Sequence, residues 1–195
     1  MNIGIDIDGT LTAIGQYQLE KGGKYFKKKY NMDIKNSAGF TIKEIFDCTS
    51  EQEYKFWVKH LLSYSIKEPA ILNSDKVTCQ LKKEGHKIFI ITSREFTIKN
   101  NPAGMLMRYI VKRWLKKYHI AYDHIIFCGD DKTQAILDNN IDLMIDDKPE
   151  NILPLKDKIK ILCYTAAWNK DIKELDPYRV NNFDEIEEYL RDKSK

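Results

Sequence analysis

Short apolar runs along the chain are separated by longer amphipathic stretches, a pattern typical of strands that alternate with helices. The apolar runs predict five strands, at residues 2–7, 87–91, 124–128, 143–145 and 160–164. The amphipathic stretches predict helices at residues 74–84, 102–118, 134–139 and 184–191. Alternating strands and helices favour an α/β fold, in which helices cover both faces of one parallel sheet.

Residues 17–67 show helical periodicity and contain no convincing strand. Ser50 and Glu53 have the spacing of a capping box at the start of a helix. A short helix is also expected at residues 41–46. Because this segment lies between the first and second strands, it leaves the sheet where the first strand ends and is well placed to act as a lid. We therefore expect a catalytic core of residues 1–14 and 70–195 and a helical cap of residues 15–69.

Polar side chains follow four of the predicted strands, at the point where each strand ends. They are Asp6 and Asp8, then Thr92, then Lys132, then Asp146 and Asp147. Ligands of open parallel sheets bind beyond the carboxyl ends of the strands, so these groups are expected to converge. Four carboxylates in one crevice repel one another unless a cation is present. Hard oxygen ligands select Mg²⁺, with Asp6 and Asp146 as ligands and Asp147 as a further ligand or as an outer partner that orients a metal-bound water.

These residue types suit phosphoryl transfer. A carboxylate at Asp6 can attack phosphorus in line, and Asp8 can serve first as acid and then as base. Gly9 lets the chain turn close to a phosphate. Thr92 offers a hydroxyl to a phosphoryl oxygen, and Lys132 supplies a compact positive charge.

Each motif taken alone has a plain structural reading. Asp8-Gly9-Thr10 could form a turn, Thr92-Ser93 could cap a helix, and Asp146-Asp147-Lys148-Pro149 could also be a turn. Arg94 suits a phosphate or the cap of the following helix equally well. The four motifs in this order, each after an apolar run, are hard to obtain by chance, which favours an active site.

The order Asp-x-Asp-Gly-Thr, strand-Thr, Lys and strand-Asp-Asp resembles the haloacid dehalogenase-like phosphohydrolases. Ile-Ile-Thr-Ser-Arg, Asp-Lys-Thr and Leu-Met-Ile-Asp-Asp-Lys-Pro are similar to the 5′(3′)-deoxyribonucleotidase branch. The resemblance implies a Rossmann-like core, Mg²⁺ and an aspartyl-phosphate intermediate. By match, Asp6 is the nucleophile and Asp8 the acid/base, whose backbone carbonyl also ligates the metal. Thr92, Lys132 and the pair Asp146-Asp147 match the remaining motifs.

The cap, where the resemblance is weakest, carries aromatic side chains that could stack on a base: Tyr25, Phe26, Phe46, Trp57 and Tyr64. Their helical spacing also fits a cap core, so both interpretations stay open. The residues expected to contact substrate are Gly9, Thr10, Ser93, Arg94, Phe26 and Trp57.

Composition and the spacing of the cysteines exclude several classes of protein. The chain has 195 residues, which fits one domain or one domain with an insertion, and a net charge of +3. Its four cysteines have no metal-ligand spacing, which argues against zinc and against a disulfide framework. We found no apolar stretch of membrane-spanning length and no signal-like segment, so we expect a cytoplasmic protein. Residues 96–120 carry six basic residues and no acid, a pattern that fits a solvated helix face better than an anion-binding surface.

The motifs predict a Mg²⁺-dependent phosphomonoesterase, and the resemblance implies that it acts on nucleoside monophosphates. The alternative keeps the chemistry and changes the substrate to a sugar phosphate or another small phosphoester. A signalling receiver domain is disfavoured because its lysine follows its acid pairs, and an inactive binding module because no motif residue is missing. The expected partner is a small-molecule phosphomonoester, not nucleic acid or a membrane, and an apolar cap surface is a candidate homodimer interface.

Overall fold

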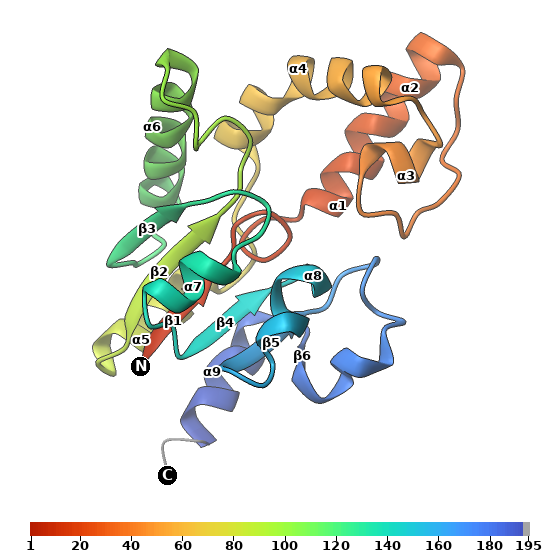
Figure 1. Ribbon diagram of the computed structural model, residues 1–195. Coiled ribbons are helices and arrows are strands. Elements are labelled where there is room, and N and C mark those ends of the chain that lie inside the picture. The colour runs from red at the N-terminus through yellow and green to blue at the C-terminus, as the bar shows by residue number, and fades with distance from the viewer. Residues whose placement is uncertain (193–195) are drawn as a thin grey trace.

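The computed structural model describes residues 1–192 and has one sheet of six parallel strands in the order β3-β2-β1-β4-β5-β6 (Figure 1). The strands are β1 Asn2–Ile5, β2 Lys87–Thr92, β3 His124–Phe127, β4 Leu143–Asp146, β5 Lys160–Tyr164 and β6 Arg179–Val180. The chain order reverses on either side of β1, which pairs with β2 on one side and with β4 on the other. A ligand site is expected at that reversal, beyond the carboxyl ends of these strands.

Alternating strand residues pack into two separate apolar clusters, one on each face of the sheet. Ile88 and Ile90 of β2 belong to the first cluster, whereas Phe89 and Ile91 belong to the second. Helices α5 (Ser74–Lys83), α6 (Pro102–Lys117) and α9 (Phe183–Asp192) contribute to the first cluster. Helices α7 (Thr133–Asp138), α8 (Pro149–Ile152), η2 (Leu153–Leu155) and η3 (Lys173–Tyr178) contribute to the second. The predicted α/β fold with helices on both faces is confirmed.

A group of helices between β1 and β2 lies apart from the sheet, at the upper right of Figure 1. It comprises α1 (Ile14–Tyr17), the π-helix η1 (Gln18–Gly22), α2 (Gly23–Tyr30), α3 (Ile42–Phe46) and α4 (Ser50–Lys67). These helices share an apolar cluster of their own, centred on Phe26, Phe46 and Phe56. Because that cluster is separate from the two on the sheet, we propose that residues 15–69 form a cap and the rest the core.

Several boundaries differ from the expected ones. β1 ends at Ile5, which leaves Asp6 and Asp8 in the loop that follows. β6 was not predicted, since its two residues are too few to show a pattern. Ser74 is the first residue of α5, and Asn73, in the left-handed region, occupies the cap position.

The capping box of α4 also lies one residue earlier than expected. The Thr49 hydroxyl accepts the backbone N–H of Gln52, and the Gln52 side chain accepts the backbone N–H of Thr49. Thr49 and Gln52 satisfy the same three-residue spacing as Ser50 and Glu53, so the sequence pattern allowed both registers.

Large apolar side chains are exposed on neighbouring faces of α4 and α6. They include Tyr54, Val58, Leu62 and Ile66 on α4 and Met105, Leu106 and Tyr109 on α6. A homodimer that forms through an apolar surface of this kind stays a prediction. None of the helices within residues 1–192 is long and apolar enough to cross a membrane.

Two variants test which residue caps the N-terminus of α4. Thr49→Ala removes the hydroxyl that accepts the backbone N–H of Gln52 in the first turn of the helix, so the free energy of unfolding should fall by about 1 kcal/mol. Ser50→Ala should change it by less than about 0.5 kcal/mol, because Ser50 lies inside the first turn. Urea unfolding of both variants measures the difference. A larger loss for Ser50→Ala would contradict the assignment of Thr49 as the cap.

Candidate active site

The loop after β1 brings two carboxylates to the reversal of strand order. The backbone N–H of Asp6 donates to the carbonyl of Ile145 at 3.0 Å, which continues the pairing of β1 with β4 by one residue. The chain then turns at Gly9, where φ is +106° and a Cβ would come within 2.3 Å of the Asp147 carboxylate. Only glycine combines this backbone conformation with so close an approach. Thr10 donates its hydroxyl proton to Asp147 Oδ1 at 3.2 Å.

Lys132 lies at the centre of the acidic cluster although it is only 1% exposed. Its Nζ donates to Asp6 Oδ1 at 2.6 Å and to Asp146 Oδ2 at 2.7 Å. Burial opposes the charge of the ammonium group, yet the two carboxylates outweigh burial and raise the pKa of Lys132 above its usual range. The ammonium group therefore stays charged and joins the ends of β1 and β4.

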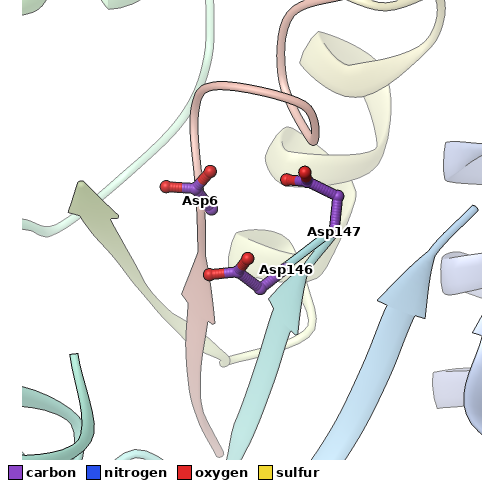
Figure 2. A group of neighbouring side chains, drawn as sticks. All are labelled: Asp6, Asp146 and Asp147. Atoms are coloured by element: carbon purple, nitrogen blue, oxygen red, sulfur yellow. The ribbon is translucent and has the colours of Figure 1, made fainter. Parts of the chain in front are cut away.

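The carboxylates of Asp6, Asp146 and Asp147 lie side by side at these strand ends (Figure 2). Each offers an oxygen within 4.8 Å of the others, and all three residues are buried. Asp146 is satisfied by the protein, because Lys132 and Asn151 donate to Oδ2 and the backbone N–H of Lys148 donates to Oδ1. Asp147 Oδ2, by contrast, is buried and has no hydrogen-bond partner.

Burial and mutual repulsion raise the pKa values of two of these groups. Burial raises the pKa of Asp6 to about 7, against the opposing charge of Lys132 and with a further rise from Asp146. Burial, followed by the charges of Asp146 and Asp6, raises the pKa of Asp147 well above its usual range. Lys132 alone therefore does not neutralise the cluster.

The cluster fits a divalent cation. An unpartnered buried carboxylate oxygen is costly unless something positive contacts it, and Asp147 Oδ2 is such an atom. Asp6 Oδ2 also has no hydrogen bond from any residue in the described part of the chain. Carboxylate oxygens in this number and this proximity are ligands that Mg²⁺ accepts.

Asp8 lies apart from this cluster and has partners of its own. Arg94 Nε donates to Asp8 Oδ2 at 2.9 Å, and Arg94 Nη2 donates to Oδ1, forming a bidentate pair. The Tyr64 hydroxyl donates to Asp8 Oδ1 at 2.6 Å. Burial would raise the pKa of Asp8, but Arg94 and Tyr64 hold it below its usual range. Nε and Nη2 of Arg94 are thus engaged with Asp8, and contact of Arg94 with a phosphate stays a prediction.

Thr92 and Ser93, at the end of β2, have different surroundings. Thr92 is the last residue of β2 and is 1% exposed, and its hydroxyl accepts the backbone N–H of Arg94 at 3.2 Å. Ser93, the next residue, lines the cavity described below.

A cavity of about 700 Å³ opens between the carboxylates and the cap. Asp6, Asp8, Arg94, Lys132 and Asp147 form its inner end. Its outer walls are apolar and come from α4, α6 and the loop before α6: Tyr54, Trp57, Val58, Leu61, Leu62, Phe96, Ala103, Leu106 and Met107.

Of the two cap aromatics expected to contact substrate, Trp57 lines this cavity and Phe26 does not. Phe26 is fully buried and stacks on Phe46 with ring centroids 4.6 Å apart, so its assignment as a substrate contact is corrected. Tyr25 and Phe46 also belong to the cap core.

The sequence analysis did not predict the residues that hydrogen bond to Asp146 and to the backbone carbonyl of Asp147. Asn151 donates to Asp146, and Asn169 Nδ2 donates to the carbonyl of Asp147 at 2.7 Å. Trp168 Nε1 donates to the same carbonyl at 3.2 Å. Asn151, Trp168 and Asn169 lie outside the four strand-end motifs, so nothing local in the sequence indicated their role.

Comparison with known proteins places the chain in a family. Residues 1–195 match the model of the family "5' nucleotidase, deoxy (Pyrimidine), cytosolic type C protein". The chain belongs to this family. A nucleotidase of Clostridium acetobutylicum is 28% identical over 189 residues, which cover 95% of this chain and 91% of that protein.

Solved structures agree on the fold. A predicted phosphatase from Clostridium acetobutylicum superposes with a TM-score of 0.66 at 17% identity and covers 98% of each chain. A HAD-superfamily hydrolase of subfamily IA from Geobacter sulfurreducens superposes with a TM-score of 0.60 at 11% identity, covering 97% of this chain and 95% of that one. The family match confirms the expected resemblance to the deoxyribonucleotidase branch, and membership of this family makes the protein a phosphoric monoester hydrolase.

The raised pKa of Asp147 predicts how stability depends on pH in EDTA. Since the folded pKa lies above the unfolded one, ionisation destabilises the fold, and stability should fall as pH rises from about 4 toward neutrality. Asp147→Asn removes this charge and should increase the free energy of unfolding by about 1–3 kcal/mol at pH 8, and by less at pH 5. Urea unfolding at both pH values measures it. Asp157→Asn, on an exposed turn, is the control, and a gain for Asp147→Asn that does not depend on pH would contradict the account.

Proposed function

We propose that the protein hydrolyses nucleoside monophosphates to nucleoside and phosphate through a phosphorylated Asp6. The observation that carries the proposal is the environment of Asp6. Lys132 holds Oδ1 at 2.6 Å, Oδ2 is not hydrogen bonded by the described residues, and the residue faces the cavity. A fixed carboxylate with one free oxygen beside a buried cation is suited to attack on phosphorus.

The two aspartates of the first loop divide the reaction between them. Asp6 attacks phosphorus and the bond from phosphorus to the ester oxygen breaks. Asp8, which is ionised in the free protein, first takes up a proton from the solution and then gives it to the leaving alcohol. In the second step Asp8 takes a proton from water, the water oxygen attacks phosphorus, and the bond from phosphorus to Asp6 breaks. Phosphate leaves, Asp8 releases its proton to the solution, and Asp6 and Asp8 return to their starting states.

We further propose that Mg²⁺ is held by the Asp6 and Asp147 side chains together with the Asp8 carbonyl. Asp147 replaces Asp146 as the preferred ligand, since Asp146 is occupied by Lys132, Asn151 and Lys148. When bound, the ion neutralises charge on the phosphoryl group. Asp146 instead fixes the ammonium group of Lys132 against Asp6.

The outer walls of the cavity support a nucleotide over a sugar phosphate. Trp57, Leu61 and Met107 among others present apolar surface beyond the charged end. A nucleobase can bury its flat faces against such walls, whereas the hydroxyl groups of a sugar would lose hydrogen bonds to water there. Ser50 and Glu53 are polar residues at the cap side of the cavity.

A panel of phosphomonoesters tests the substrate. With Mg²⁺ present, deoxynucleoside 5′-monophosphates should be hydrolysed with a kcat/KM at least about tenfold above that for glucose 1-phosphate, because only the base gains contact with the apolar walls. Phosphate release measures both. Better hydrolysis of the sugar phosphate would support the alternative substrate class and contradict the nucleotidase proposal.

A single substitution tests the role of Asp6 as the nucleophile. Asp6→Asn keeps the size of the side chain and removes the nucleophile, so kcat should fall by several orders of magnitude, about 10³-fold or more. Circular dichroism should show that the fold is kept. Asp157→Asn is the matched control and should retain activity. Full activity in Asp6→Asn would refute the assignment.

A further inference from the structure

Tyr64 connects the cap to the reacting groups of the core. It belongs to α4, yet it is 2% exposed and its hydroxyl reaches the loop after β1. Its ring lies 4.8 Å from that of Tyr17 and 5.3 Å from the guanidinium of Arg94, by centroid distances. Among the cap side chains of residues 15–69, Tyr64 is the one that hydrogen bonds to Asp8.

The hydrogen bonds around the Tyr64 hydroxyl have a definite direction. An ionised carboxylate has no proton to give, so Tyr64 donates to Asp8 Oδ1 at 2.6 Å. The Thr12 hydroxyl lies 2.7 Å from the Tyr64 oxygen, 3.1 Å from the Ile7 carbonyl oxygen and 3.4 Å from Asp8 Oδ1. Tyr64 thus orients Asp8, and Thr12 contacts both of them.

The carboxylate of Asp8 is therefore held from two parts of the molecule. Arg94 binds it from the core through both oxygens, and Tyr64 binds it from the cap through Oδ1. Asp8 keeps only part of its surface exposed, with its side chain 22% accessible. A displacement of α4 would remove the contact from Tyr64 and leave the one from Arg94.

We propose that Tyr64 is a positioning residue that orients Asp8 for proton transfer only when the cap is seated on the core. The inference rests on the proposed role of Asp8 as acid and base. It makes the first chemical step depend on cap position, since the hydroxyl that completes the environment of Asp8 arrives with α4. Tyr64 packs against other rings as well, but packing needs the ring alone and the hydroxyl serves Asp8.

The test compares leaving groups. A nucleoside leaves as a poor alkoxide and needs a proton from Asp8, whereas p-nitrophenolate leaves without one. Tyr64→Phe removes only the hydroxyl, so kcat/KM for a deoxynucleoside monophosphate should fall about 10- to 100-fold. For p-nitrophenyl phosphate it should change by less than about threefold. Because kcat/KM reports the steps through the first bond cleavage, later hydrolysis of the phosphorylated enzyme does not obscure the comparison.

Three further variants serve as comparisons for this result. Asp8→Asn should show the same selectivity between leaving groups with a larger loss on the nucleotide. Tyr17→Phe, which removes a hydroxyl from the neighbouring ring, should leave both substrates unaffected. Thr12→Val removes a hydroxyl that contacts both Tyr64 and Asp8 and should show the selectivity of Tyr64→Phe in weaker form. Equal losses on both substrates in Thr12→Val would contradict the proposal even if Tyr64→Phe does not fold.

Equal losses on both substrates in folded Tyr64→Phe, or no loss on the nucleotide, would overturn the positioning role. Those outcomes would leave the proposed function intact, because the wild-type protein would still hydrolyse the nucleotide. If the wild-type protein hydrolysed p-nitrophenyl phosphate but no nucleotide, the substrate proposal would fail. In that case the positioning role of Tyr64 would still be tested, by comparing Tyr64→Phe with the wild-type protein on an alkyl phosphate that the wild-type protein hydrolyses.

Discussion

Lys132 and the carboxylates around it form the contact on which the rest of the site depends. Asp6 follows β1 and Asp146 ends β4, which are neighbouring strands, so the sheet itself forces their charges together. A single buried ammonium group joins them at 2.6 and 2.7 Å. One positive charge does not compensate Asp147 as well, and its unpartnered oxygen is what the proposed cation would contact. The same crowding that costs stability fixes the nucleophile in place.

The fold could be predicted from the sequence because hydrophobic periodicity is a direct physical consequence of burial. Strands buried on both faces appear as continuous apolar runs, and the residues that end them reach the same edge. The convergence of Asp6, Lys132 and Asp146 followed from this rule alone. β6 could not be predicted, since two residues carry no period, and the capping box of α4 shifted because two overlapping pairs fit the same spacing.

The cap could be predicted only as a helical segment. Helical spacing shows which side chains share a face, but it does not show whether that face meets the cap interior or the cavity. Phe26 and Trp57 looked alike in the sequence, yet Phe26 stacks inside the cap and Trp57 lines the cavity. Likewise, nothing local distinguishes Asp146 from Asp147. Their difference arises from Asn151, which is near in sequence, and from Lys132 and the tight turn at Gly9, which reach the pair only in the fold.

In the proposed reaction Asp6 carries the phosphoryl group during turnover. Acid quenching of the wild-type protein during hydrolysis with Mg²⁺, followed by peptide mass spectrometry, detects such a group. One added phosphoryl group is expected on the peptide that contains Asp6, and none on that peptide in Asp6→Asn. Steady turnover with no phosphorylated peptide, or the group found on Asp147, would contradict this role of Asp6.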